Sequence, residues 1–273
     1  MKRLISILLT SAVSALPAVA QDSKVETITL QVAPATAKDS NALRLLPATP
    51  DLKDGNASVV MLRMIWEQTM WMQKVWPKLG EVAELPHDDP RVAEIPFDGF
   101  QRQLYRAAMM RHADWEYPID SEPLATILLP DVQGFRNLAG RGMHIWTGQQ
   151  IAKGNLHGAR EGILTQFACA RHIAQTPFLV THLVANAISQ MGLDRIELLI
   201  QQPDAPNLYW ALAGLPKSIG PVKDAIELES RALIKSLPSF GDGVPATGDS
   251  KWQSAADEFV TFMNLSNPRQ LTP

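Results

Sequence analysis

The 273 residues carry 25 Lys and Arg against 28 Asp and Glu, with 46% hydrophobic and 19% charged residues, a composition that excludes bulk disorder. The formal charge of -3 provides no basic surface for a nucleic-acid backbone, so nucleic acid is not an expected partner. Cys169 is the only cysteine, which excludes an intramolecular disulfide and any zinc site that needs two or more thiolates.

Residues 1–20 have the three parts of a secretory signal. Met1-Lys2-Arg3 is a positive start, residues 4–16 are an apolar run, and Ala18-Val19-Ala20 is a small-x-small cleavage site. The apolar run is shorter than the roughly 20 residues that span a bilayer. We therefore expect a cleaved signal peptide, an exported protein that is periplasmic or extracellular, and no integral membrane span in the processed chain.

Residues 21–55 are predicted to form an extended arm and linker. Apolar and polar residues roughly alternate over Val25–Val32, which predicts one short strand or extended segment. Prolines 34, 47 and 50, together with Gly55, then predict an irregular chain up to Asn56.

Residues 56–237 are predicted to form a helical domain. Pro77 should stop the first helix, which is mostly apolar, and Asn155 should cap the one that follows Gly154. Residues 238–250 are a predicted loop, 251–265 a C-terminal helix and 266–273 a tail. The helices expected within the domain are Ser58–Trp76, Asp98–His112, Asp131–Lys153, Leu156–Ala174, Thr176–Gln202 (capped at Thr176-Pro177), Leu208–Gly214 and Pro221–Leu237.

The short connections between residues 131 and 202 predict antiparallel neighbours, and hence the fold class. We expect an all-α array of antiparallel helical hairpins, tetratricopeptide-like but degenerate, with the extended N-terminal arm. The spacing of Gly154, Ala159 and Ile163 resembles the turn glycine, small residue and large apolar residue of such a repeat. No period of about 34 residues recurs cleanly, so a generic helical bundle is the alternative.

Several short segments carry a resemblance. They are Leu45-Leu46-Pro47, Gly55-Asn56-Ala57, Asp114-Trp115, Leu128-Leu129-Pro130 and the long run from Ile200 to Leu212. On these segments, over roughly residues 43–238, the chain resembles an uncharacterised family of exported all-helical proteins abundant in planctomycete-type bacteria. The resemblance implies fold and export but no activity. Members often carry a cysteine where this chain has Ala113, so it implies no role for a thiol, and they tend to continue further beyond Leu265.

Histidines on the predicted helices are the residues to check for a metal. His157 and Glu161 are spaced i, i+4, and Cys169 and His172 are spaced i, i+3, so either pair could supply two ligands. A third ligand, His144 or His182, would join only if the helices aligned it. A surface His-Glu pair and a buried structural thiol are the favoured interpretation, so neither a metal nor a cofactor is predicted.

Methionines and tryptophans of the first helix are interpreted as core. Thioethers suit Cu(I), but methionine also fills irregular gaps between helices. Tryptophans that step by five residues do not share one helix face, so they should be separate core anchors. The residues concerned are Met61, Met64, Met70 and Met72, with Met109 and Met110 later, and Trp66, Trp71 and Trp76.

Three aromatic residues, Trp115, Tyr209 and Trp210, are the binding candidates. They lie near helix ends beside prolines, where a ring either locks a corner or offers a binding surface. The acidic pairs at residues 88–89 and 114–116 are adjacent in sequence, which does not hold two carboxyls across a cleft, and Asp89 before Pro90 should be a helix cap. No nucleophile elbow or phosphate-binding loop is present, so no catalytic residue is predicted.

The leading functional hypothesis is a non-enzymatic exported module that binds a protein or peptide partner. The alternative is a cell-envelope enzyme or metal-handling protein whose site is assembled from distant helices. A structural envelope component that self-assembles is a third possibility. Catalysis is therefore left open, and a non-enzymatic function is favoured.

Overall fold

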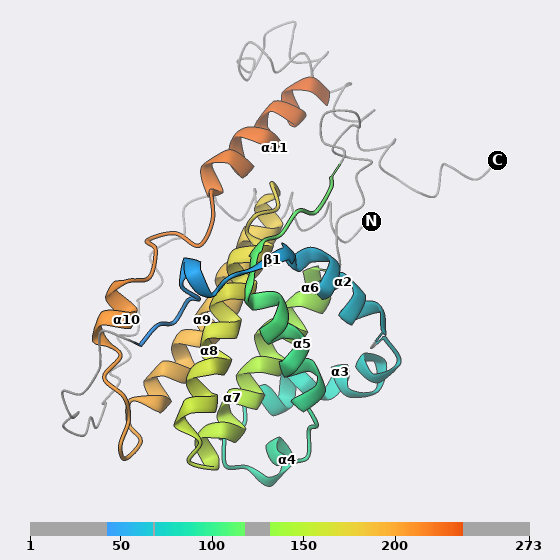
Figure 1. Cartoon of the computed structure of the whole chain (residues 1–273). Coiled ribbons are helices and arrows are strands. Elements are labelled where there is room, and N and C mark those ends of the chain that lie inside the picture. Colours follow the sequence, from blue (N-terminus) through green and yellow to red (C-terminus); the bar gives the residue numbers. More distant parts are fainter. Residues whose placement is uncertain (1–42, 68, 118–131, 237–273) are drawn as a thin grey trace, which may run out of the picture. The chain divides into compact units, whose positions relative to one another are not determined.

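A computed structural model describes residues 43–67, 69–117 and 132–236, which are mostly helical, in agreement with the predicted class (Figure 1). Residues 43–117 and 132–226 belong to one compact unit, and residues 227–236 belong to another. The predicted signal peptide, the strand at Val25–Val32, the loop at 238–250, the helix at 251–265 and the tail lie outside the described residues. No helix in the described ranges combines the length and apolar character needed to cross a membrane.

A two-stranded parallel sheet is the first departure from the predictions. Strand β1 (Lys53–Asn56) follows a short 3₁₀ turn, η2 (Thr49–Asp51), and pairs with β2 (Met110–His112) in the register Lys53 to Met110 and Asn56 to His112. The predicted irregular chain up to Asn56 is therefore wrong for Lys53–Asn56, and so is the predicted helix end at His112. Helix α5 spans Asp98–Ala108. It ends there because the backbone that follows pairs with β1, and the first bond of this pairing runs from the Lys53 amide to the Met109 carbonyl at 2.8 Å.

The first predicted helix is two helices, α2 (Ala57–Glu67) and α3 (Thr69–Ala83). The expectation that Pro77 stops it is wrong, because Pro77 lies inside α3. A proline removes one backbone hydrogen bond, but α3 continues past it and buries Leu79 and Val82 in the core, which favours the helical course. The short helix α4 (Pro90–Ala93) follows, and its predicted cap is confirmed: the Asp89 side chain accepts from the Arg91 amide at 2.9 Å.

Helix α2 has a buried side and an apolar exposed side. Met61 and Met64 are fully buried, which confirms the packing interpretation for these two methionines. Trp66 is 84% exposed, so its assignment as a core anchor is wrong. Trp66 shares an i, i+3, i+7 face with Val59 and Leu62, and α2 turns this whole face outward. The side chains of residues 70–72 and 76 lie outside the described part of the chain.

The helix expected from Asp131 to Lys153 is present in the described residues but is not uniformly α-helical. It consists of α6 (Val132–Phe135), a seven-residue π-helical segment η4 (Arg136–Gly142) and α7 (Met143–Ala152). Gly154, at φ +70°, then reverses the chain as predicted. The cap that begins α8 (Leu156–Ile173) is confirmed too, because the Asn155 side chain accepts from the Gly158 amide at 3.1 Å.

Helix α9 (Leu179–Leu199) is shorter than predicted at both ends. The N-cap residue of α9 is Phe178, whereas Thr176 was predicted. The Thr176 hydroxyl does not cap the helix, because it donates to the Ile173 carbonyl at 2.8 Å and bonds to the Thr181 hydroxyl. The helix continues through Gly192, as expected. Helices α10 (Tyr209–Ala213) and α11 (Val222–Ser236) lie where they were predicted.

Helix α8 is central to the larger unit, in contact with α5, α7 and α9 (Figure 1). Gly162 allows the close approach of α7, because a Cβ atom there would overlap the Thr147 hydroxyl and lie 3.1 Å from the Trp146 ring. Within the described residues, the core has two clusters of buried side chains. One gathers around Met61, Leu104, Phe135, Leu138 and Ile188, and the other around Leu45, Ile163, Phe167, Leu199 and Leu208. Burial of Leu45 in the second cluster fixes the segment before β1 against the helices.

Candidate binding site

Two segments noted separately in the sequence, Gly55-Asn56-Ala57 and Asp114-Trp115, meet at the end of the small sheet. The Asn56 side-chain amide donates to the Asp114 carbonyl at 2.8 Å and accepts from the Asp114 amide at 2.8 Å. Its oxygen also accepts from the Ser58 amide at 3.1 Å, at the start of α2. The Asn56 side chain therefore both extends the strand pairing and caps the start of α2. An amide can do this because it has a donor and an acceptor on one side chain.

Trp115, a binding candidate, lies in this corner and is half-buried. Its indole nitrogen donates to the His172 carbonyl at 3.0 Å, at the end of α8, and its ring packs edge-on against Phe135 with centroids 5.2 Å apart. Both polar and apolar parts of the side chain are thus engaged by the fold. This arrangement matches a ring that locks a corner.

We expect Trp115→Phe to lower the free energy of unfolding by about 1 to 2 kcal/mol, because the hydrogen bond to the His172 carbonyl is lost. Urea denaturation of the two proteins measures the difference. The exposed Trp210 provides the matched control, since Trp210→Phe should change stability by less than about 0.5 kcal/mol. Equal effects of the two substitutions would contradict a structural role for Trp115.

Tyr209 and Trp210, the other two candidates, lie together on the surface of α10. Their side chains are 65% and 57% exposed, and their rings meet edge to face with centroids 5.0 Å apart. The opposite side of α10 is fixed to the core, because Leu208 and Ala211 are buried in the second core cluster. The Asn207 side chain also accepts from the Tyr209 amide at 3.0 Å. The structure therefore presents an exposed aromatic pair on a fixed support, called here the aromatic pair.

The residues considered for a metal are brought together only in pairs. His157 Nε2 lies 3.8 Å from Glu161 Oε1 near the surface, and the Arg160 guanidinium lies 3.4 Å from His157 Nδ1. Cys169 and His172 are buried in α8, and His182 is buried in α9. Within the ranges that the structure describes, no three His, Cys, Asp or Glu side chains gather closely enough to hold a metal ion.

Burial determines the chemical state of the α8 pair. It raises the pKa of the Cys169 thiol to about 12, so the thiol is protonated and unreactive near neutral pH. It lowers the pKa of His172 to about 4, and the nearby Arg171 charge acts in the same direction. The imidazole is therefore neutral near pH 7. The Cys169 sulfur contacts the Leu104 carbonyl at 3.8 Å, which fits the predicted structural thiol.

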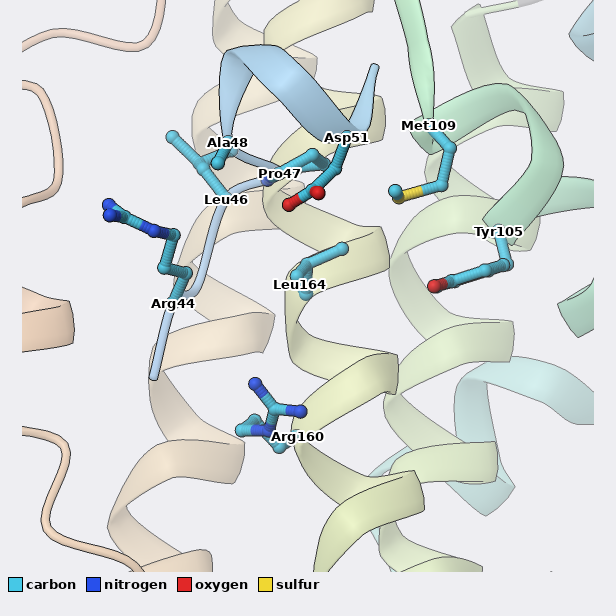
Figure 2. Close-up of a pocket in the computed structure, with 9 residues that line it drawn as sticks. All are labelled: Arg44, Leu46, Pro47, Ala48, Asp51, Tyr105, Met109, Arg160 and Leu164. Carbon is cyan, nitrogen blue, oxygen red and sulfur yellow. The ribbon is translucent and has the colours of Figure 1, made fainter. Parts of the chain in front are cut away.

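A pocket of about 390 Å³ lies in the larger unit, and Figure 2 shows its lining. One wall is the segment just before β1, and the others come from α5 and α8. Pairing of β1 with β2 and burial of Leu45 hold the first wall in place against the helices. The lining residues are Arg44, Leu46, Pro47, Ala48 and Asp51 from the first wall, Tyr105 and Met109 from α5 and the residue after it, and Arg160 and Leu164 from α8.

Charged residues of both signs line this pocket, and the Arg44 guanidinium turns away from its middle in Figure 2. In the view of Figure 2 the Asp51 carboxylate and the Tyr105 hydroxyl turn toward its middle, and Arg160 lies on the side opposite Asp51. The pKa of Tyr105 is raised, first by burial and then by the Glu161 charge, while Arg160 acts in the opposite direction and Asp51 adds a smaller increase. The hydroxyl is therefore protonated at neutral pH and can both donate and accept a hydrogen bond.

Sequence reasoning did not single out the charged residues of this pocket. Arg44 lies in a segment interpreted as linker, Asp51 lies beside prolines, and Arg160 lies between two residues chosen for other reasons. No local pattern joins them, because they meet only when the segment before β1 folds onto α8. The one available signal was the Leu45-Leu46-Pro47 segment of the resemblance, which contributes Leu46 and Pro47 to the lining.

Comparison with known proteins assigns no family. The chain matches no family model, and no curated protein or solved structure matches it either. The residues of the site, and their chemistry, therefore carry the functional argument.

Proposed function

We propose that this protein is an exported, non-enzymatic module that binds a protein or peptide partner through the aromatic pair, Tyr209 and Trp210. The observation that carries the proposal is the large exposure of two adjacent aromatic rings on a helix that is itself anchored in the core. Tyrosine and tryptophan are the residue types enriched among the side chains that dominate protein-protein affinity. A fixed support reduces the entropy lost on binding.

Two further parts of the proposal concern architecture and location. Helices α7, α8 and α9 follow one another with short connections and contact each other, which supports a tetratricopeptide-like stack of hairpins preceded by an extended arm. Such stacks serve as supports for partner binding without chemistry. Export is supported by the signal-like pattern of residues 1–20.

The test is a mild cross-linking pull-down from the envelope of the cells that make the protein. The wild-type chain is compared with Tyr209→Ser/Trp210→Ser and with the control Leu183→Ser, which removes an exposed apolar side chain from α9. We expect one dominant partner at near-equal amount, and a recovery reduced about tenfold or more by the double substitution alone, because two such rings contribute at least about 1.4 kcal/mol. Equal recovery with all three proteins, or recovery of the chain alone, would overturn the proposal.

A further inference from the structure

Residues 214–221 connect α10 to α11 (Figure 1). Gly220, near the end of this connection, lies against the end of α8 and the start of α9. A Cβ atom at position 220 would lie 2.5 Å from the Cβ atom of Ala174 and 2.9 Å from Cε1 of the His182 ring. The absence of a side chain allows this close approach, so the backbone of Gly220 covers the imidazole directly.

The His182 ring is enclosed but only partly hydrogen-bonded. The residue is 2% exposed, and the Thr176 carbonyl accepts a hydrogen bond from its ring. The other nitrogen, Nε2, is buried without a hydrogen-bond partner among the described residues. Protonation of Nε2 would create a charged donor without an acceptor, which costs far more than an unused lone pair. Because Nε2 is bonded to Cε1, Gly220 lies beside the nitrogen that would take up the proton.

The charges around the ring do not compensate for its enclosure. Burial lowers the pKa of His182, while the Thr176 carbonyl and the Asp224 carboxylate act in the opposite direction without outweighing it. Among the charged residues that the structure describes, Asp224, at the start of α11, is the one that acts on this ring. The closed arrangement around His182 therefore favours the neutral ring.

The connection, rather than the helix that carries His182, is the part that can move. Thr181 and Ala185, which flank His182 on the 21-residue helix α9, are fully buried. In the connection, by contrast, residues 216–218 and 221 are exposed. The start of α11 is held to the larger unit by burial of Ala225.

We propose that His182 and Gly220 form an acid-sensitive joint, in which protonation of Nε2 detaches Gly220 and the first turn of α11 from α8 and α9. The neutral ring keeps them attached. For a protein that is exported, as proposed above, the joint would make the exposure of the start of α11 depend on the external pH. None of its residues belongs to α10, so the joint and the partner surface can fail independently.

Hydrogen exchange of the full chain at pH 7 and pH 5, corrected for the intrinsic exchange rate at each pH, tests the joint. The amides of Val222, Asp224 and Ala225 report its opening, because they donate to the Gly220 and Pro221 carbonyls at 2.9, 3.0 and 3.4 Å. We expect opening to be several-fold more frequent at pH 5. The limit is about 25-fold, for a ring of ordinary pKa 6.5 that takes up its proton only when the joint is open. The increase should exceed that for amides in the middle of α8.

Variants assign the effect to the joint. His182→Gln cannot be charged and should lose the acid-induced increase, whereas the control His157→Gln, which removes an exposed histidine of α8, should retain it. Gly220→Ala places a methyl group against Ala174 and should raise the opening already at pH 7. Circular dichroism confirms that each variant is folded. Equal opening of the wild-type joint at both pH values, an increase that persists in His182→Gln, or unchanged exchange of Gly220→Ala at pH 7 would overturn the proposal.

Discussion

Acidification from pH 7 to pH 4 is expected to lower the free energy of unfolding by about 3 kcal/mol through His172, and by a similar or somewhat smaller amount through His144. Both histidines have a pKa of about 4 in the folded chain, against an ordinary value of 6.5. Burial is the main cause for both, aided by the charge of Arg171 near His172 and of Arg195 near His144.

The direction of this change in stability follows from the protons that the folded and unfolded chains bind. Between pH 6.5 and about 4 the unfolded chain takes up protons on these rings and the folded chain does not, so acid favours the unfolded chain. Carbonyl groups near His172, those of Ala107 and Ala108, favour its charged form but do not outweigh burial. The stability contributed by each neutral ring is therefore complete above about pH 6.5 and is lost as the pH falls toward 4.

Urea denaturation at a series of pH values measures this effect. His172→Gln should reduce the slope of stability against pH, because it removes one of the imidazole rings whose pKa is lowered by burial. The control Ile173→Val changes the packing of the next buried residue on α8 without removing a titratable group. It should lower stability and leave the slope unchanged. A wild-type stability that is constant over this pH range would show that these histidines are hydrated in the folded chain.

Gly162→Ala is expected to destabilise the protein by about 1 to 3 kcal/mol, the usual cost of overpacking a core. The new methyl group would overlap the buried Thr147 hydroxyl and lie 3.1 Å from the Trp146 ring, where α7 and α8 approach closely. Alanine favours a helix over glycine by about 1 kcal/mol, which opposes the loss. The expected destabilisation is the net effect that remains after this gain. Chemical denaturation measures the change.

Two companion variants isolate the cause. Gly80→Ala, on α3, has no neighbouring atom within 4 Å of the added methyl group and should stabilise the protein by about 0.5 to 1 kcal/mol. Thr147→Ala removes the overlapping hydroxyl, which makes no hydrogen bond in the structure, and should restore part of the stability lost in Gly162→Ala. No recovery in the double variant would mean that the backbone, rather than Thr147, limits the approach of the two helices.

The helical elements could be predicted where local residues determine them. Gly154 and Asn155 form a turn and a cap through contacts within a few residues, and Asp89 caps α4 in the same way. Pro77 shows where a local rule fails, since the burial of residues that follow it keeps α3 intact. The sheet was missed because the residues of β1, Lys-Asp-Gly-Asn, are polar and lack strand periodicity, and their partner lies far along the chain.

The candidate site was predicted only in part. Tyr209 and Trp210 could be chosen because aromatic residues near predicted helix ends and beside prolines can be recognised in the sequence. Their exposure, which separates them from the half-buried Trp115, is known only from the structure. The hydrogen bond from the Trp115 indole to the end of α8 could be recognised only in the tertiary structure. The charged pocket was not predictable, since Arg44 and Arg160 come from segments that only the fold brings together.

The parallel pairing of β1 with β2 also bears on the order in which the chain folds. Asn56 and Asp114, bonded at the end of that pairing, are 58 positions apart, whereas α7, α8 and α9 contact their neighbours along the chain. Contacts between distant segments form late, because the entropy lost in closing a long loop precedes any favourable interaction. Helices α7 to α9 should therefore assemble first. The wall that carries Arg44 and Asp51 is then placed in one of the last steps, so the pocket that it lines exists only in the completed fold.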